Sequence, residues 1–237
     1  MLPLVVVDEL LLTPGPPHAE IKAATLSKLT NTVILRMIKA VLSKSPSIIN
    51  RTQMDKTAHT ELHRLFLVDG LPDPLTTASA HLQVFDTYIP HTRLRVRQMR
   101  DPLTNQWNRV LQQRFCVNQT EHAVTKLVEM HLDDDEFAIF ERMRGSETRK
   151  NRYFHDFDGR GVMFDVYLGE LRGLTLARID FDSRTGMLDY GPAPFMRIEV
   201  TENDFFESRT LASKSMSDLE AELARLSAVI PPPIQDE

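Results

Sequence analysis

The chain has 237 residues, 42% hydrophobic and 26% charged, so it can bury a core and lacks the composition of a disordered protein. Its formal net charge of −5 argues against a general nucleic-acid binder, and no apolar run is long enough to span a bilayer. The single cysteine, Cys116, excludes an internal disulfide framework and a cysteine-based zinc site, which fits a cytoplasmic location.

Residues 1–55 differ in pattern from the rest of the chain. A proline-rich break at 14–17 precedes residues 18–44, where apolar residues recur near helical spacing. The apolar start lacks a basic region and is interrupted by Asp8 and Glu9, unlike a signal peptide. Two interpretations stay open, of which we favour the second: an accessory helix, or upstream sequence read from too early a start codon, with Met54 as the true start.

Short segments of alternating polarity follow one another from residue 61 onward. We expect strands at 61–68, 82–88, 92–100, 107–116, 124–132, 151–158, 161–168, 174–182 and 194–201. Many strands with few helices predict an antiparallel barrel or sandwich over residues 56–215.

Two helices are predicted beside these strands. In "LDDDEFAIFERM", Asp133 is the expected N-cap and Glu136 completes a capping box. In "MSDLEAELARLSAVI", Leu219, Leu223 and Leu226 share a stripe with Ile230, so residues 216–230 should dock as an amphipathic helix. The 216–237 segment would then consist of this helix and a fraying tail.

The clearest charge signal is "HTRLRVRQMR", in which Arg93, Arg95 and Arg97 alternate with Leu94 and Val96. On a strand, this spacing places three guanidinium groups on one face. Taken alone, such a strand is most simply a solvated sheet face, because like charges this close repel unless water or an anion separates them.

Charges on other strands favour a different interpretation. Further basic residues fall at alternating positions: Arg114, Lys150 and Arg152, although an outward-pointing Lys150 stays open. Acidic residues follow in the later strands: Asp165, Asp180 and Glu199. A closed barrel lined in this way would suit a polyanion that a divalent cation bridges to the acidic side. Arginine matches phosphate oxygens, and carboxylates hold Mg²⁺ or Mn²⁺.

From Glu61 to about Leu211 the sequence resembles the CYTH superfamily of triphosphate tunnel metalloenzymes. The resemblance rests on "FLV", "RLRVR", "RY", "DVYLGELRGLTLARIDF" and "EVT", in this order, and "DVYLGELRGLTLARIDF" is the most specific of them. It implies an eight-stranded antiparallel β-barrel that forms a closed tunnel. It also implies Mg²⁺ or Mn²⁺ as cofactor and hydrolysis of inorganic triphosphate, thiamine triphosphate or nucleoside triphosphates, or cyclisation of ATP.

The sequence departs from the family pattern at several charged positions. The first-strand signature E-x-E-x-K keeps Glu61 but has His63 and Leu65 in place of the second acid and the lysine. On "LARIDF", where the family usually has E-x-E, Arg178 replaces the first acid and Asp180 keeps the second. Arg114 stands where the family has lysine. These changes argue for an altered substrate, weak catalysis or none, and they make a second metal ion harder to hold.

The resemblance implies the following roles. Metal ligands would be Glu61, Asp165, Asp180 and Glu199, with Glu61 and Glu199 catalytic; phosphate-binding residues would be Arg93, Arg95, Arg97, Arg114 and Arg152. His63 could ligate Mn²⁺ or act as a base, but we favour a neutral hydrogen-bonding role. The partner would be a small molecule containing triphosphate, with no nucleic acid or membrane.

Three functions stay open on the sequence alone. The first is a metal-dependent triphosphatase, and the second is a non-catalytic polyphosphate or nucleotide binder on the same barrel. The third is an interaction scaffold whose C-terminal helix supplies a partner surface or the contact of a homodimer.

Overall fold

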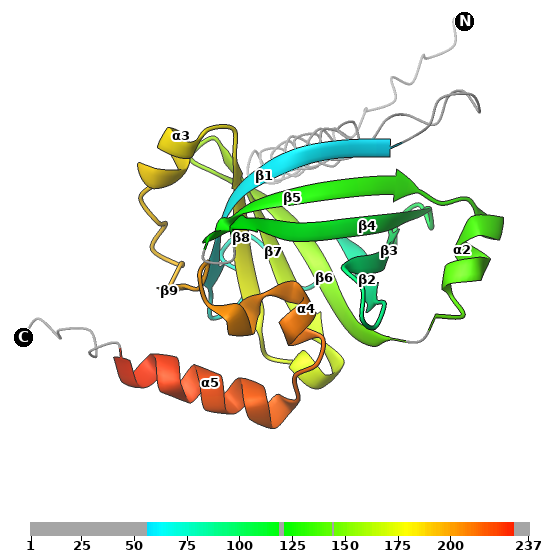
Figure 1. Cartoon of the computed structure of the whole chain (residues 1–237). Helices are drawn as coiled ribbons and strands as arrows, with labels where there is room; N and C mark the ends of the chain where they lie inside the picture. The colour runs from blue at the N-terminus through cyan, green and yellow to red at the C-terminus, as the bar shows by residue number, and fades with distance from the viewer. Residues whose placement is uncertain (1–55, 119–120, 144, 230–237) are drawn as a thin grey trace, which may run out of the picture.

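The computed structural model describes residues 56–118, 121–143 and 145–229, and its main feature is a curved β-sheet that closes on itself (Figure 1). The strands are β1 (Lys56–Leu67), β2 (His81–Tyr88), β3 (Leu94–Arg100), β4 (Trp107–Asn118), β5 (Glu121–His131), β6 (Ser146–Phe157), β7 (Arg160–Leu168), β8 (Thr175–Phe181) and β9 (Ile198–Glu199).

The ring is closed by β1, which pairs with a different strand on each side. It pairs with β8 over Leu62–Leu67 and with β5 over Lys56–Leu62, and the order β5-β4-β3-β2-β6-β7-β8-β1 then returns to β5. All of these pairs are antiparallel. The predicted eight-stranded antiparallel barrel is therefore confirmed. Because side chains alternate along each strand, every second residue points into the barrel.

The ninth expected strand, at 194–201, is wrong in extent and in place. Only Ile198 and Glu199 form β9, which pairs with Phe66 and Leu67 at the end of β1 and lies outside the ring. Pro192 and Pro194 precede it, and proline has no amide hydrogen to donate to a neighbouring strand.

Much of the apolar core lies on the outer face of the barrel. Phe66, Phe164 and Ile179 point outward from β1, β7 and β8 into an apolar cluster. Met187 of α3 (Arg184–Leu188) and Met196 of the segment that follows this helix also belong to the cluster. This arrangement explains how the barrel interior can be polar, because folding is stabilised by apolar surface buried outside the strand ring.

The remaining helices cover other parts of the barrel. Helix α2 (Asp134–Phe140) begins at the predicted capping box and packs Phe137 against Val96 on the outer side of β3. The short segments η1 (Gly169–Leu171), η2 (Asp204–Phe206) and α4 (Ser208–Leu211) contribute to a second cluster, which includes Tyr167 of β7.

The predicted C-terminal helix is present as α5 (Met216–Val229), below the barrel in Figure 1. Leu219 is buried against the second cluster, and Leu223 and Leu226 are partly buried there, so the predicted docking stripe is correct at these positions. Ile230 and the helix expected within 18–44 lie outside the described residues. None of the described helices is long and apolar enough to cross a membrane.

Candidate functional site

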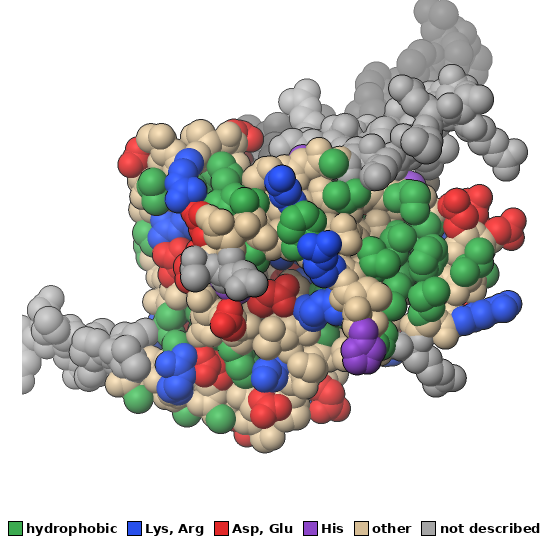
Figure 2. Space-filling model, viewed as in Figure 1, with side chains coloured by type: hydrophobic (Ala, Val, Ile, Leu, Met, Phe, Trp, Pro, Cys, Tyr) green, Lys and Arg blue, Asp and Glu red, His purple; other side chains and the backbone are tan. Residues whose placement is uncertain are grey.

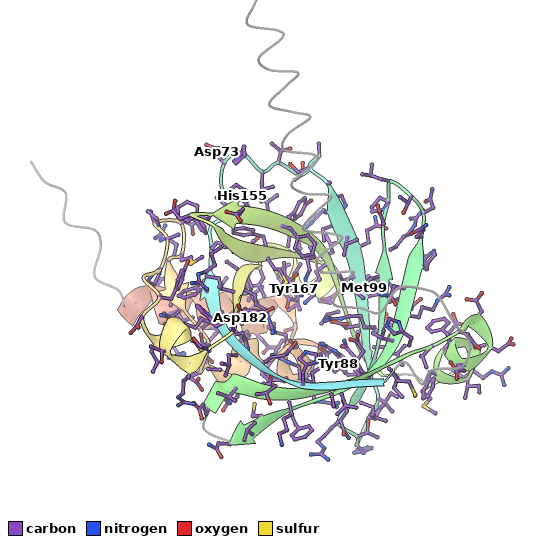
Figure 3. All side chains as sticks on the ribbon, turned by 90° about the horizontal axis from the view of Figure 1, so that it is seen from above. Asp73, Tyr88, Met99, His155, Tyr167 and Asp182 are labelled. Atoms are coloured by element: carbon purple, nitrogen blue, oxygen red, sulfur yellow. The ribbon has the colours of Figure 1, made fainter. Side chains whose placement is uncertain are left out.

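The barrel encloses a cavity of about 600 Å³. Seven of the ring strands contribute side chains to its wall, and residues between Thr201 and Ser208 cover one side. Seen from above, Met99 and Tyr167 lie inside the ring of strands (Figure 3). On the face shown in Figure 2, basic and acidic side chains lie next to one another around the centre of the molecule.

The first group of charges in the barrel is centred on Asp86, which is 1% exposed. Asp86 lies opposite Arg97 in the pairing of β2 with β3 and accepts two hydrogen bonds from it, at 2.6 and 2.7 Å. An Arg95 nitrogen lies 3.6 Å from the same carboxylate. Burial alone would raise the pKa of Asp86, but the charges of Arg97 and Arg95 outweigh it and hold the pKa well below its usual range.

Arg95 is further positioned by neutral groups on the strands beside it. Its Nε donates to the Gln112 side chain at 2.6 Å, and a terminal nitrogen donates to the Tyr88 hydroxyl at 3.3 Å. Gln112 in turn donates to Glu129 on β5. These bonds hold the guanidinium group of Arg95 inside the barrel, where the residue is 6% exposed.

The second group is centred on Asp165 of β7. Arg152 donates two hydrogen bonds to it, at 2.7 and 2.8 Å, and the Lys150 ammonium lies 2.7 Å away. Burial raises the pKa of Asp165, but Arg152 and Lys150 reverse this shift and hold it well below its usual range. For Lys150, burial is the largest effect and lowers the pKa to about 8, although Asp165 opposes that shift.

Together, the two groups have more positive than negative charges. Four basic side chains surround the two buried aspartates: Arg95, Arg97, Lys150 and Arg152. If all are ionised, the excess is two positive charges, and the half-buried Glu129 is connected to them through Gln112. Buried charges that lack a full set of counter-charges are costly, so this part of the barrel favours an added anion.

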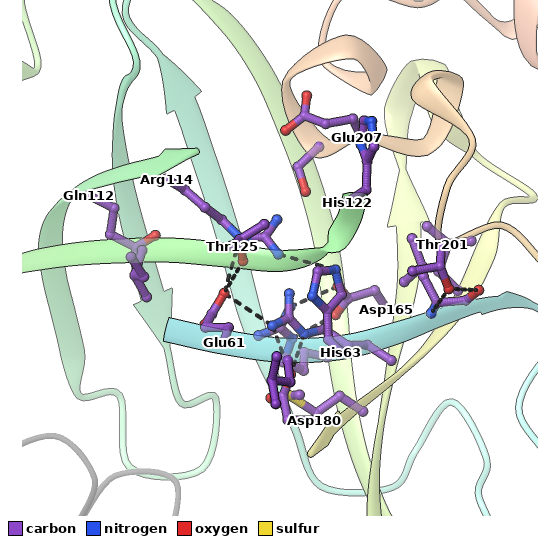
Figure 4. Close-up of a pocket in the computed structure, with 18 of the residues that line it drawn as sticks. Glu61, His63, Gln112, Arg114, His122, Thr125, Asp165, Asp180, Thr201 and Glu207 are labelled. Carbon is purple, nitrogen blue, oxygen red and sulfur yellow. Dashed lines mark hydrogen bonds and ion pairs between the residues drawn. The ribbon is translucent and has the colours of Figure 1, made fainter. Parts of the chain in front are cut away.

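The third group is centred on Glu61 of β1 (Figure 4). Its Oε2 accepts hydrogen bonds from Arg114 at 3.1 Å and from the Thr125 hydroxyl at 3.2 Å, and a nitrogen of Arg178 lies 3.2 Å away. Arg178 also contacts Asp180, at 2.7 Å. Burial raises the pKa of Glu61, but Arg178 and Arg114 outweigh it and hold the pKa far below its usual range. In this third group the two cations, Arg114 and Arg178, balance the two anions, Glu61 and Asp180.

His63 lies beside this third group and is 6% exposed. Its Nε2 accepts a hydrogen bond from Arg114 at 3.3 Å, whereas Nδ1 forms no well-directed hydrogen bond to a described residue. Burial first, and then the charges of Arg178 and Arg114, lower the pKa of His63 well below its usual value. The ring is therefore neutral near pH 7, which makes it a poor proton acceptor and favours a hydrogen-bonding role.

Two residues that the sequence placed in the site lie outside it. Arg93 precedes the first residue of β3, is exposed, and stacks on the Phe115 ring at 4.7 Å, so it lies apart from the other predicted phosphate-binding arginines. Glu199 pairs with Phe66, which points outward, and cross-strand partners share a face. Its carboxylate therefore binds Arg64 on the outer surface and lines a separate, smaller pocket.

The four expected metal ligands do not converge. Asp165 and Glu61 belong to different charge groups, and each is already bound by two cationic side chains. Glu199 is on the outer surface, and Asp180 is bound to Arg178. Among the described residues, no three His, Cys, Asp or Glu side chains are close enough to hold a metal ion. The donor set therefore does not fit a protein-held Mg²⁺ or Mn²⁺.

The structure also adds residues that sequence reasoning missed. Asp86 was not singled out from the sequence. It shares the buried face of β2 with Leu82, Val84 and Tyr88, and an acid within this otherwise apolar set was the available signal. Lys150, whose direction stayed open, points into the barrel and is 4% exposed. The inward positions of Arg95, Arg97, Arg114 and Arg152 agree with the sequence pattern.

The chain has low sequence similarity to several known proteins. No family model matches the chain. It is 26% identical over 156 residues to an inorganic triphosphatase of Nitrosomonas europaea, and the match covers 65% of this chain and 97% of that protein. A crystal structure of an inorganic triphosphatase is 23% identical, with a TM-score of 0.45 over 65% of this chain and 95% of its own. A conserved hypothetical protein from Pyrococcus furiosus is 14% identical, with a TM-score of 0.36 over 53% of this chain and 80% of its own.

Proposed function

We propose that this chain binds a linear triphosphate inside the barrel and hydrolyses its terminal phosphoanhydride bond. The observation that supports the proposal most directly is the excess of basic side chains around Asp86 and Asp165, deep in a cavity of about 600 Å³. A cavity of this size suits a small molecule. The sequence similarity to an inorganic triphosphatase supports the same class of substrate.

Binding would use guanidinium groups that are already oriented. Asp86 and Asp165 each hold one arginine, Arg97 and Arg152, through two parallel hydrogen bonds. These bonds use Nε and one N–H of Nη2, so the other N–H groups of each guanidinium can donate to phosphate oxygens. Side chains fixed in advance lose little entropy when the ligand arrives. Lys150 would add an ammonium donor between them.

Hydrolysis would depend on charge stabilisation more than on a strong base. In the proposed reaction a water oxygen attacks the terminal phosphorus, the bridging P–O bond breaks, and pyrophosphate leaves with the bonding electrons. The transition state is loose, and its charge lies on the phosphate oxygens that Arg95, Arg97 and Arg152 would contact. The proton of the attacking water goes to the released phosphate or to solvent, because Glu61, with its strongly lowered pKa, is a weak base.

One observation favours a second candidate, a triphosphate-binding protein without catalysis. Glu61, Asp86 and Asp165 are each bound by two basic side chains, and His63 has a lowered pKa. These bonds leave the carboxylates poorly placed to orient an attacking water. The second candidate shares the ligand and the binding residues of the first and differs only in turnover.

Phosphate release from tripolyphosphate and from nucleoside triphosphates distinguishes the candidates. The full chain should be assayed with Mg²⁺, with Mn²⁺ and with EDTA, against a variant that combines Arg95→Ala with Arg152→Ala. Release above that of the double variant supports the triphosphatase. Tripolyphosphate binding without such release supports the binding protein, and loss of both contradicts the proposal.

A further inference from the structure

Arg178 connects two carboxylates in the wall of the cavity. Its terminal nitrogen lies 3.2 Å from Glu61 and 2.7 Å from Asp180, and its Nε donates to Asp180 at 2.8 Å. The pairing of β1 with β8 sets this arrangement, since Asp180 lies opposite His63 and Arg178 opposite Leu65. Glu61 lies two residues before His63 on β1, so its side chain points to the same inward face as His63 and Leu65.

Two neighbouring carboxylates are the usual protein contribution to a Mg²⁺ or Mn²⁺ site. In this barrel, the space between Glu61 and Asp180 is instead crossed by a guanidinium group. That cation is covalently attached to the chain and remains charged at every ordinary pH, since the two carboxylates raise its pKa further although burial opposes them. A metal ion placed there would have to displace Arg178 and bring like charges into contact.

We infer that Arg178 takes the position of a divalent cation between Glu61 and Asp180, and that this barrel binds a triphosphate without a metal ion. The inference deepens the proposed function and rests on it for the identity of the ligand. The role of Arg178 itself can be tested without any ligand. Removing the guanidinium and adding an acid should create a metal site that the natural chain lacks.

The first test measures Mn²⁺ binding alone, by calorimetry and by the electron paramagnetic resonance spectrum of bound Mn²⁺. The wild-type chain should show no binding at millimolar Mn²⁺, and Arg178→Glu should bind the ion with an affinity at least ten times higher. Arg172→Glu is the matched control, because it makes the same charge change at an exposed position and should behave as the wild type. Adding Asp180→Asn to Arg178→Glu should remove the gained site.

Mn²⁺ binding by the wild type as tight as that of Arg178→Glu would overturn the inference. A folded Arg178→Glu variant that gains no Mn²⁺ affinity would overturn it as well. Because the added acid brings three carboxylates together, folding is checked first by circular dichroism. If Arg178→Glu does not fold, the decision rests on the wild-type Mn²⁺ titration and on the second test.

The second test uses only the wild-type chain and measures the rise in melting temperature with tripolyphosphate in EDTA. Ligand binding to the folded state raises this temperature by mass action. A rise in EDTA supports metal-independent binding, and a rise only when Mn²⁺ is added overturns it. If tripolyphosphate gives no rise in either buffer, the proposed function fails, while the Mn²⁺ titrations still decide the role of Arg178.

Discussion

Arg97 and Asp86 face each other across β3 and β2 inside the barrel and form two hydrogen bonds of 2.6 and 2.7 Å. Both are almost completely buried, so the charge of each depends on the other for its compensation. The contact fixes the direction of the Arg97 guanidinium group. It also makes the stability of the folded protein depend on the Asp86 carboxylate.

We predict that Asp86→Asn lowers the free energy of unfolding by about 3 kcal/mol or more, because it leaves Arg97 buried without its counter-charge. Urea unfolding followed by circular dichroism measures the change. The matched control is Asp69→Asn, which removes a carboxylate paired with Arg197 on the surface and should cost less than about 1 kcal/mol. Equal losses in the two variants would contradict the role given to Asp86.

The pH dependence of binding should follow Lys150. Burial lowers the pKa of Lys150 to about 8, so the side chain is a cation below this pH and becomes neutral above it. Asp86 and Asp165 stay ionised throughout the neutral range, because their pKa values are held well below normal. Tripolyphosphate affinity should therefore fall as the pH rises past 8, by up to about tenfold per pH unit.

Calorimetric titration between pH 6 and pH 10 checks this dependence, and Lys150→Arg is the control. Arginine keeps its charge over the whole interval, so the variant should show no step attributable to position 150. A wild-type profile that is flat across pH 8, or a step that persists in Lys150→Arg, would refute the assignment.

The two glutamates that the sequence treated as equivalent should behave differently. Glu199→Gln should leave tripolyphosphate affinity within about twofold of wild type, because Glu199 binds Arg64 outside the cavity. Glu61→Gln should raise the affinity about tenfold, because it removes a negative charge from the cavity and releases Arg114 and Arg178 for the ligand. Titration calorimetry of both variants with tripolyphosphate measures these affinities. Weaker binding by Glu199→Gln would show that Glu199 takes part in ligand binding.

Much of the barrel could be predicted because its strands follow a simple alternation. The eight ring strands overlap the expected segments, and the inward direction of Arg95 and Arg97 follows from their spacing. The pattern failed at strand ends. Arg93 has the same spacing as Arg95, but the chain turns at His91, which has a positive φ of 57°, and β3 starts only at Leu94.

The charge pairs could not be predicted in the same way. A contact such as Arg152 with Asp165 depends on the register between β6 and β7, and alternation within one strand does not define that register. From alternation alone, we expected the basic and acidic residues on opposite sides of a tunnel. The structure instead intermixes them, and this intermixing is why the expected metal ligands are already occupied.

The most direct test of the account compares two arginines that are two residues apart. Arg95 is buried in the cavity and Arg93 is exposed outside it, so Arg95→Gln and Arg93→Gln remove the same charge from different sides of the barrel wall. In calorimetric titrations with tripolyphosphate, Arg95→Gln should reduce the affinity about 10- to 100-fold, because it removes one charged hydrogen-bonding group from the cavity. Arg93→Gln should reduce the affinity less than about twofold. Equal effects, or a larger effect of Arg93→Gln, would contradict binding inside the barrel.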